Sequence, residues 1–217
     1  MEIIYFLAFI LFLFPATVPA QTKGYEYIML VLQNPFNRNG TSPWTIHGLW
    51  AERLQGPSPN YKFVPVNNCP SAPPFNREIN SDIQAALIKA WPSIMGKPNL
   101  KFWEHEWGKH GSCTTDLLPT SNDYLLKGVY LWEQIKFHDL MGVGPGAQFM
   151  PNTQYDANTV MAAITSKYKV KTMLTCQGGE ILDVRFCYLG PWVLVDCLDT
   201  QPPPGTVCTG LIYYPRI

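Results

Sequence analysis

Four side chains able to carry chemistry stand together in the stretch FWEHEWGKHGSC, residues 102–113. They are His105, Glu106, Lys109 and His110, and two tryptophans lie among them. Placing a charge among aromatic rings is costly unless the charge is paired, and ionisable groups with perturbed pKa values gather at active sites. The stretch therefore predicts part of a catalytic site.

A second stretch, WTIHGLW at residues 44–50, holds His47 in a similarly apolar setting. Taken alone, His47 between Ile46 and Trp50 would more often be a hydrogen-bonded core histidine than a catalyst. Joined to the first stretch, it becomes a partner for a second histidine. We expect the two stretches to meet in space and to form one catalytic site.

The spacing of the histidines in the longer stretch argues against a zinc protease. On a helix, residues four apart lie about 40° apart around the axis, and residues five apart lie about 140° apart. Glu106 and His110 then share a face, as do His105 and Lys109. The H-E-x-x-H motif of zinc proteases needs both histidines on one face, whereas this chain has H-E-x-x-x-H. A three-histidine zinc site that adds His47 stays open, although nothing in the sequence requires it.

Two imidazoles, a carboxylate and an ammonium suit a reaction in which one proton is removed while another is delivered. Lys109 would add a positive charge for the anionic transition state of phosphoryl transfer. RNA already holds a nucleophile beside each phosphorus, the ribose 2′-hydroxyl, and DNA lacks this group. The residues therefore favour cleavage of an RNA phosphodiester without a metal or other cofactor.

The elements that position these residues belong to a chain of 217 residues, which is enough for one domain with a full core. Residues 1–20 form an apolar run ending in Val-Pro-Ala, which predicts a secretory signal peptide, although it contains no Lys or Arg. The apolar run before Pro15 is about a dozen residues, short of the roughly 20 that span a bilayer. We therefore expect residues 21–217 to form a single secreted domain, extracellular or vacuolar, that does not contact the membrane.

The composition is globular, because 47% of the residues are hydrophobic and 15% are charged. Sixteen basic and sixteen acidic residues balance, so RNA binding must depend on a local basic site. Asn39 begins an N-glycosylation sequon, Asn-Gly-Thr. In a secreted chain six cysteines predict three disulfides, and fifteen pairings are possible.

Hydrophobic patterning predicts strands interspersed with helices, which is an α+β fold. We expect a buried strand at 25–33, a short strand ending at Gly48, and an irregular segment at 56–75. Ser81 and Asp82 are expected to open a helix, and Ser121 to cap another whose inner residues include Leu126, Tyr130 and Ile135. Further helices are expected around the catalytic stretch and at 156–168, and strands at 170–176, 180–189, 192–198 and 211–217.

The two histidine stretches resemble the active-site segments of the ribonuclease T2 family, secreted acid ribonucleases that include plant S-like RNases and self-incompatibility S-RNases. LVLQ at 30–33, WPS at 91–93 and the C-terminal cysteines extend the resemblance over almost the whole mature chain. It implies an α+β fold with a central antiparallel sheet and several packed helices. It also implies cleavage of single-stranded RNA to 2′,3′-cyclic phosphate ends, followed by slower hydrolysis, with no metal. We expect a monomer.

The resemblance also implies roles for individual residues. His110 would take the proton of the 2′-hydroxyl, and His47 would protonate the leaving 5′-oxygen. Glu106 and Lys109 would stabilise the pentacoordinate phosphorane, and His105 would help to hold the phosphate.

Base-binding residues and disulfides follow from the same resemblance. Gln33, Ser93, Met95 and Phe102 fall where the family lines a base pocket, and Trp50 falls near the other base site. The implied disulfides are Cys69 with Cys113, Cys176 with Cys208, and Cys187 with Cys197.

The chain departs from the family at positions that border the base sites. Asn34 stands where the family usually has Trp, and Ala51 where it usually has Pro. The short loop 35–43 lacks a cysteine pair that plant members commonly carry. Two alternatives follow: a catalytically impaired T2-like storage or defence protein, and a self-incompatibility S-RNase. S-RNases are typically basic, so the near-neutral charge counts against the second alternative.

Overall fold

The computed structural model of the chain describes residues 24–34, 44–58, 60–94, 96–198 and 205–215. The predicted signal peptide, the sequon at Asn39 and the predicted base-binding residue Met95 lie outside these ranges. No helix within the described ranges is long and apolar enough to cross a membrane.

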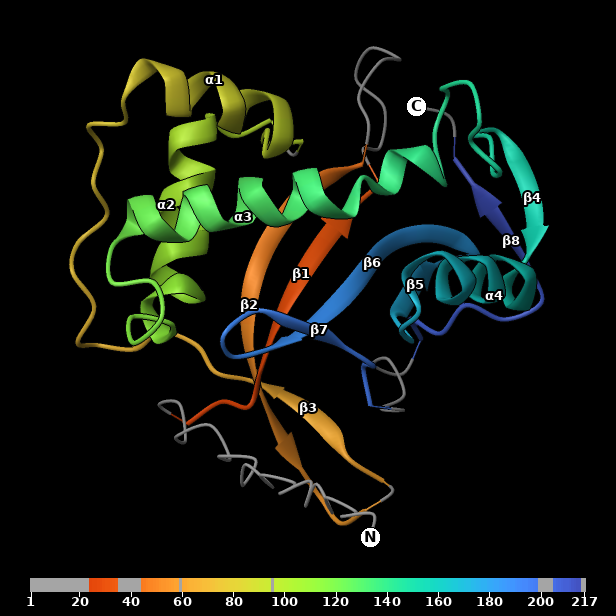
Figure 1. Cartoon of the computed structure of the whole chain (residues 1–217), viewed down its shortest axis with the longest axis horizontal. Helices are drawn as coiled ribbons and strands as arrows, with labels where there is room; N and C mark the ends of the chain where they lie inside the picture. The colour runs from red at the N-terminus through yellow and green to blue at the C-terminus, as the bar shows by residue number, and fades with distance from the viewer. Residues whose placement is uncertain (1–23, 35–43, 59, 95, 199–204, 216–217) are drawn as a thin grey trace, which may run out of the picture.

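A twisted eight-stranded sheet runs through the described part of the chain (Figure 1). The strand order is β3-β2-β1-β6-β8-β4, and β5 and β7 also pair with β6. Every strand pair is antiparallel except β6 with β8, which is parallel. The strands are β1 (Tyr27–Gln33), β2 (Thr45–Gln55), β3 (Lys62–Pro65), β4 (Thr153–Asp156), β5 (Met173–Gln177), β6 (Glu180–Leu189), β7 (Val193–Val195) and β8 (Leu211–Tyr214).

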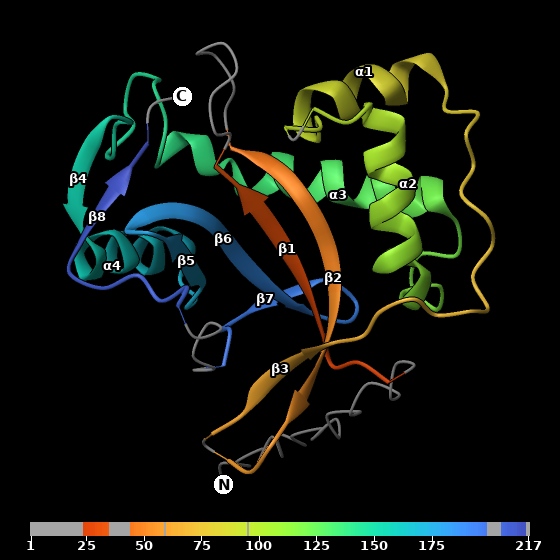
Figure 2. The ribbon, with the colours of Figure 1, turned by 180° about the vertical axis from the view of Figure 1, so that it is seen from behind.

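Helices pack at both ends of this sheet. Seen from behind in Figure 2, α1 and α2 stand beside β2, α3 runs across the sheet, and α4 lies near β5 and β8. The predicted α+β fold with a central, mainly antiparallel sheet and packed helices is confirmed. The helices are α1 (Ser81–Ala90), α2 (Asn99–Lys109), α3 (Ser121–Ile135) and α4 (Ala157–Tyr168), with short 3-10 turns η1 (Gly111–Cys113) and η2 (Phe137–Asp139).

The central strands are buried on both faces, as expected for β1. Leu30 and Leu32 face the large core beneath the helices, whereas Met29 and Val31 face a smaller apolar cluster on the opposite side. This alternation follows from the two-residue period of a strand. Because both faces of β1 are covered, its sequence is a continuous run of mainly apolar residues.

The strands of the first half extend further than the sequence predicted. β2 does not end at Gly48 but continues to Gln55, and β3 lies inside the segment that was expected to be irregular. Because turn-forming residues flank β3 on both sides, the sequence pattern did not indicate this strand of four residues. β4 was not predicted either; it pairs with β8 immediately before α4.

α1 begins at Ser81 as predicted, whereas the cap of α3 differs from the prediction by one residue. The Asn80 side chain caps α1 by accepting a hydrogen bond from the Asp82 N–H at 2.9 Å. Thr120 caps α3 and forms a reciprocal capping box with Asp123. Ser121 is instead the first residue of α3, and its hydroxyl accepts a hydrogen bond from the Asn76 N–H at 2.9 Å.

The predicted inner face of α3 was wrong for two of its three residues. Ile135 is buried, but Leu126 and Tyr130 are 43% and 53% exposed. The helix buries larger aromatic side chains instead, among them Tyr124 and Trp132. These rings pack against the sheet and α1, so they determine which face of α3 turns inward.

Three disulfides join Cys69 to Cys113, Cys176 to Cys208, and Cys187 to Cys197. This is the pairing that the family resemblance implies. The first disulfide connects the segment after β3 to η1, directly after α2.

Candidate active site

His47 lies at a β-bulge in β2. The register between β2 and β1 shifts between Val31 and Leu32, so His47 is an extra residue with no partner across the pair. A bulge bends the strand and redirects a side chain. His47 and Trp50, which are three residues apart, therefore contact each other, with ring centroids 5.0 Å apart. In a regular strand their side chains would point to opposite faces.

The backbone of β2 around His47 is held by side chains from the helices. β3 pairs only with residues 52–55 of β2, so the earlier part of this edge has no strand beside it. The Trp91 indole N–H donates to the His47 carbonyl at 2.8 Å. The Tyr124 hydroxyl accepts from the Leu49 N–H at 3.1 Å and donates to the Leu49 carbonyl at 3.0 Å. These hydrogen bonds satisfy backbone groups at the free edge of β2 and hold His47 beside α2.

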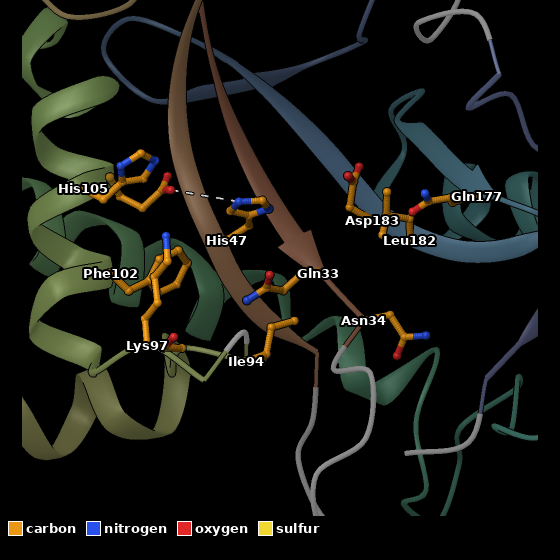
Figure 3. A pocket seen from close by; sticks show the side chains of 12 residues that line it. Gln33, Asn34, His47, Ile94, Lys97, Phe102, His105, Gln177, Leu182 and Asp183 are labelled. Atoms are coloured by element: carbon orange, nitrogen blue, oxygen red, sulfur yellow. Dashed lines mark ion pairs between the residues drawn. The ribbon is translucent and has the colours of Figure 1, made fainter.

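Glu106 and His110 enter the site from α2 and meet His47 around the Trp50 ring. Glu106 is 2% exposed, and its Oε2 accepts a hydrogen bond from Trp50 Nε1 at 3.2 Å. Its Oε1 lies 3.9 Å from His47 Nε2. A dashed line that ends at His47 marks this ion pair in Figure 3. The His110 ring stacks on Trp50 with centroids 5.0 Å apart and 22° between the planes. The two predicted stretches therefore meet.

The positions of the other α2 residues agree with the helical spacing. Glu106 and His110 are both buried, whereas His105 is exposed and Lys109 is half-buried. The described residues contain no group of three or more His, Cys, Asp or Glu side chains that could hold a metal ion. The three-histidine zinc site left open by the sequence therefore gains no support from this geometry.

Burial lowers the pKa of both catalytic candidates. The pKa of His47 falls to about 4 because of burial, an effect that Asp183 opposes and Arg185 reinforces. The pKa of His110 falls to about 3, again mainly through burial, with Lys109 adding to the effect. In the free protein both imidazoles are neutral above these values.

Glu106 shifts in the opposite direction. Burial raises its pKa to about 7, against the lowering effects of the Trp50 hydrogen bond and of Lys109. At mildly acidic pH the carboxyl group therefore keeps a proton while the neighbouring imidazoles do not. The Glu106 carboxyl group thus favours its protonated form in the free protein, with its Oε1 3.9 Å from His47 Nε2.

A cavity of about 630 Å³ opens beside His47 (Figure 3). Gln33, Ser93 and Phe102 line it, so these three predicted base-binding residues surround one space together with His47, His105 and Glu106. Gln33 is held in place because its Nε2 donates to the Thr45 hydroxyl at 3.5 Å and to the Ile46 carbonyl at 3.3 Å.

Trp50 does not line this cavity. Its ring stacks on His110, donates to Glu106, and lies 5.1 Å from the Arg185 guanidinium. These contacts place Trp50 among the ionisable groups, and its role near the other base site stays a prediction. The tryptophans of the catalytic stretch are buried and hydrogen-bonded to backbone carbonyls: Trp103 to that of Trp91 at 2.8 Å, and Trp107 to that of Pro73 at 3.0 Å.

The sequence did not predict the contribution of β6. Asp183 lines the cavity, and its carboxylate pairs with Arg185 Nε at 2.9 Å. Two alternating charged residues in an otherwise apolar strand, LDVRFC, were the available signal. Other lining residues that were not predicted as site residues are Asn34, Ile94, Lys97, Gln177 and Leu182.

Comparison with known proteins agrees with this geometry. The model of the Ribonuclease T2 family matches residues 12–197. The chain belongs to the ribonuclease T2 family. It is 32% identical over 203 residues to ribonuclease T2 of Danio rerio, covering 81% of this chain and 78% of that one. It is also 31% identical over 179 residues to ribonuclease DdI of Dictyostelium discoideum, covering 79% and 72%.

Solved structures share the fold of this T2-family chain. Human RNase T2 aligns with a TM-score of 0.69 at 22% identity and covers 88% of this chain and 99% of that one. Japanese pear S3-RNase aligns with a TM-score of 0.68 at 22% identity and covers 87% and 99%.

Proposed function

We propose that this T2-family protein is a secreted endoribonuclease that cleaves single-stranded RNA through a 2′,3′-cyclic phosphate. One observation carries the proposal: the rings of His47 in β2 and of His110, directly after α2, each have centroids 5.0 Å from that of Trp50, with the Glu106 carboxyl group beside them. The relatives named above are ribonucleases by name. Two structural neighbours, mutants of RNase MC1, were solved in complex with 5′-UMP and 5′-GMP.

His110 acts as the base of the first step. Its imidazole accepts the proton of the ribose 2′-hydroxyl, and the 2′-oxygen forms a bond to the adjacent phosphorus. The lowered pKa, about 3, keeps this imidazole neutral and able to accept a proton at the acidic pH of secretory compartments. Because the nucleophile belongs to the substrate, DNA is not cleaved.

His47 acts as the acid of the same step. As the bond between phosphorus and the 5′-oxygen breaks, His47 gives a proton to that oxygen, which leaves as a hydroxyl. Its pKa of about 4 belongs to the free protein. The negative phosphodiester beside the ring raises this pKa when RNA binds, so His47 takes up a proton from solvent while the Glu106 carboxyl group keeps its own.

Glu106, Lys109 and His105 stabilise the phosphorane. A carboxyl group with a pKa of about 7 can donate its O–H to a phosphoryl oxygen at pH 5 without adding negative charge. Lys109 supplies a fixed positive charge, and His105 lines the cavity. In the second, slower step the roles reverse: His47 activates water, which attacks phosphorus, and His110 protonates the departing 2′-oxygen. The mechanism uses no metal or cofactor.

Secretion is part of the proposal. Residues 1–20 would be removed as a signal peptide, and residues 21–217 would act as a monomeric domain outside the cell or in the vacuole. Three disulfides suit an oxidising compartment. A relative named extracellular ribonuclease LE, from Solanum lycopersicum, is 29% identical over 179 residues. Asn39 would carry a glycan.

The test is cleavage of single-stranded RNA at about pH 5, where His110 is neutral and the Glu106 carboxyl group holds its proton. We expect cyclic phosphate ends, no cleavage of the matching DNA, and full activity after chelation. His47→Ala and His110→Ala should each lower kcat/KM by about 10²- to 10⁴-fold. His138→Ala, which changes a histidine of η2 outside the site, is the matched control. A correctly oxidised protein that makes no cyclic phosphate would be the impaired storage or defence protein instead.

A further inference from the structure

Lys97 borders the cavity, but the proposed cleavage mechanism gives it no role. It lines the cavity from the turn before α2, and it is exposed. Figure 3 shows its side chain extending beside the Phe102 ring toward His105. The charge of Lys97 also contributes to the lowered pKa of His105, which places the two groups within electrostatic reach.

Among the described residues neither Lys97 nor Lys109 forms an ion pair, whereas two other cations nearby do. Arg185 is paired with Asp183 at 2.9 Å, and Lys101, one helical turn further along, is paired with Glu104 at 3.0 Å. Within the described part of the chain, Lys97 has no ion-pair partner. A lysine kept beside a cavity without a carboxylate is suited to an anion that arrives with the ligand.

The turn that carries Lys97 is anchored. The Asn99 side chain accepts a hydrogen bond from the Ser93 N–H at 2.8 Å, and the Pro98 carbonyl accepts from the Lys101 N–H at 3.0 Å and the Phe102 N–H at 3.1 Å. These bonds join both ends of the turn to α2. The position of the Lys97 backbone relative to Phe102 and His105 is therefore set by the helix.

The position of the cavity identifies which phosphate Lys97 would meet. His47 lines the cavity, whereas His110 lies behind Trp50 and does not. Under the proposed mechanism His47 protonates the leaving 5′-oxygen, so the nucleoside that carries this oxygen occupies the cavity, between Gln33 and Phe102. The next phosphate along the chain is attached to the 3′-oxygen of that same nucleoside, one sugar away from the scissile phosphate, and Lys97 lines the same cavity.

We infer that Lys97 forms a second phosphate site, which binds the phosphate on the 3′ side of the leaving nucleoside. This inference rests on the proposed ribonuclease function and deepens it. It makes the preferred substrate a chain that continues beyond the leaving nucleoside, rather than a dinucleotide end. Because the ammonium is exposed, its contribution is modest and falls as salt is added.

Three small substrates with the same bases test the inference. NpN has the scissile phosphate alone, NpNp adds a phosphate on the 3′ side of the leaving nucleoside, and pNpN adds one at the other end. We expect Lys97→Ala to lower the ratio of kcat/KM for NpNp over NpN by about three- to tenfold at low salt. The ratio for pNpN over NpN should stay at its original value, and Lys97→Arg should restore the first ratio.

Lys101→Ala is the matched control, since it removes the same charge four residues away, where Glu104 already neutralises it. An unchanged NpNp ratio in Lys97→Ala would overturn the inference, and so would an equal loss in Lys101→Ala.

A binding measurement separates this result from the ribonuclease proposal itself. By calorimetry, a nucleoside 3′,5′-bisphosphate should bind more tightly than the 5′-monophosphate, and Lys97→Ala should remove about three- to tenfold of that preference. This readout does not require turnover. If no RNA is cleaved but the preference depends on Lys97, the enzymatic proposal fails while the phosphate site stands. If RNA is cleaved and the preference does not depend on Lys97, the phosphate site fails.

Discussion

Glu106 occupies the space that a side chain at position 48 would fill. A Cβ added to Gly48 would collide with Glu106 Oε2 and Trp50 Nε1, the two atoms of the hydrogen bond that joins β2 to α2. Glycine lies in the middle of a strand here because another chain segment approaches it closely. Gly48, the residue after the catalytic candidate His47, therefore contributes to the site because it has no side chain.

Gly48→Ala should therefore lower activity without exposing a new surface. The added methyl group must displace Glu106 or Trp50, and a misplacement of about 1 Å in such a site can cost about 100-fold in rate. We expect kcat/KM for RNA to fall by about 10- to 100-fold, measured at a temperature where the variant is folded.

Gly108→Ala is the control for this substitution. It makes the same chemical change on α2, where a Cβ would meet nothing within 4 Å. Helix propensity should make it neutral or stabilising by up to about 1 kcal/mol, with activity retained. Equal activity in the two variants would show that the close approach at Gly48 has no catalytic importance.

Trp50→Phe tests the hydrogen bond that joins the tryptophan to Glu106. Phenylalanine keeps an aromatic ring for His110 to stack on but lacks the indole N–H. The lost bond lowers the pKa of Glu106 in the native protein, so its removal should raise that pKa further above its ordinary value. We expect the alkaline limb of the kcat/KM profile against pH to move to higher pH. A uniform drop in rate with an unchanged profile would instead indicate lost packing alone.

The sequence was sufficient to predict that His47, Glu106 and His110 belong to one site. Helical spacing showed that Glu106 and His110 share a face, and this follows from local geometry alone. The bulge at His47 could not be predicted, because it depends on the register between β1 and β2. Without the bulge, His47 and Trp50 would be expected on opposite faces of the strand.

The contribution of Asp183 and Arg185 depends on an even longer-range contact. They reach the site because β6 pairs with β1, and the sequence pattern does not show which strands become neighbours. The prediction of the inner face of α3 was wrong for another reason. Leu126 and Tyr130 are four residues apart and resemble an inward stripe, but the larger aromatic residues of the helix fill the core. The volume of the side chains that fill the core decides which of the two apolar stripes of α3 turns inward.

The Cys69 to Cys113 disulfide should support both stability and the position of His110. The same segment is also bonded to the end of α2, because the Asn68 N–H donates to the Lys109 carbonyl at 2.8 Å. The bridged residues are 44 apart in sequence. Replacing both cysteines by serine should cost about 4 kcal/mol by the chain-entropy relation, and activity should also fall because the end of α2 loosens.

The Cys187 to Cys197 disulfide provides the comparison. Its residues are 10 apart, so the same replacement should cost about 3 kcal/mol. Urea unfolding measures both costs, and initial rates far below each midpoint measure activity. If activity per folded molecule falls equally in both double variants, the special connection between the first disulfide and His110 is refuted.

The buried carboxyl group of Glu106 should make stability depend on pH in a predictable direction. Its pKa is raised from 4.5 to about 7, so the folded protein holds this proton more tightly than the unfolded chain does. The associated stability is fully present below pH 4.5 and is lost as pH rises through about 7. Glu106→Gln keeps the shape but has no proton to lose. Relative to the native protein, we expect its free energy of unfolding to rise by about 2 kcal/mol between pH 5 and pH 8.

Glu104→Gln is the matched control, because it makes the same change two residues earlier on α2. Hydrogen bonds from Arg77 and Lys101 lower the pKa of Glu104, so its contribution is already complete above its ordinary pKa. The stability difference between Glu104→Gln and the native protein should therefore be the same at pH 5 and pH 8. Urea unfolding at the two pH values measures all three proteins. If Glu106→Gln also shows no change with pH, the pKa of this carboxyl group is not raised in the folded protein, and it cannot donate an O–H to a phosphoryl oxygen at mildly acidic pH.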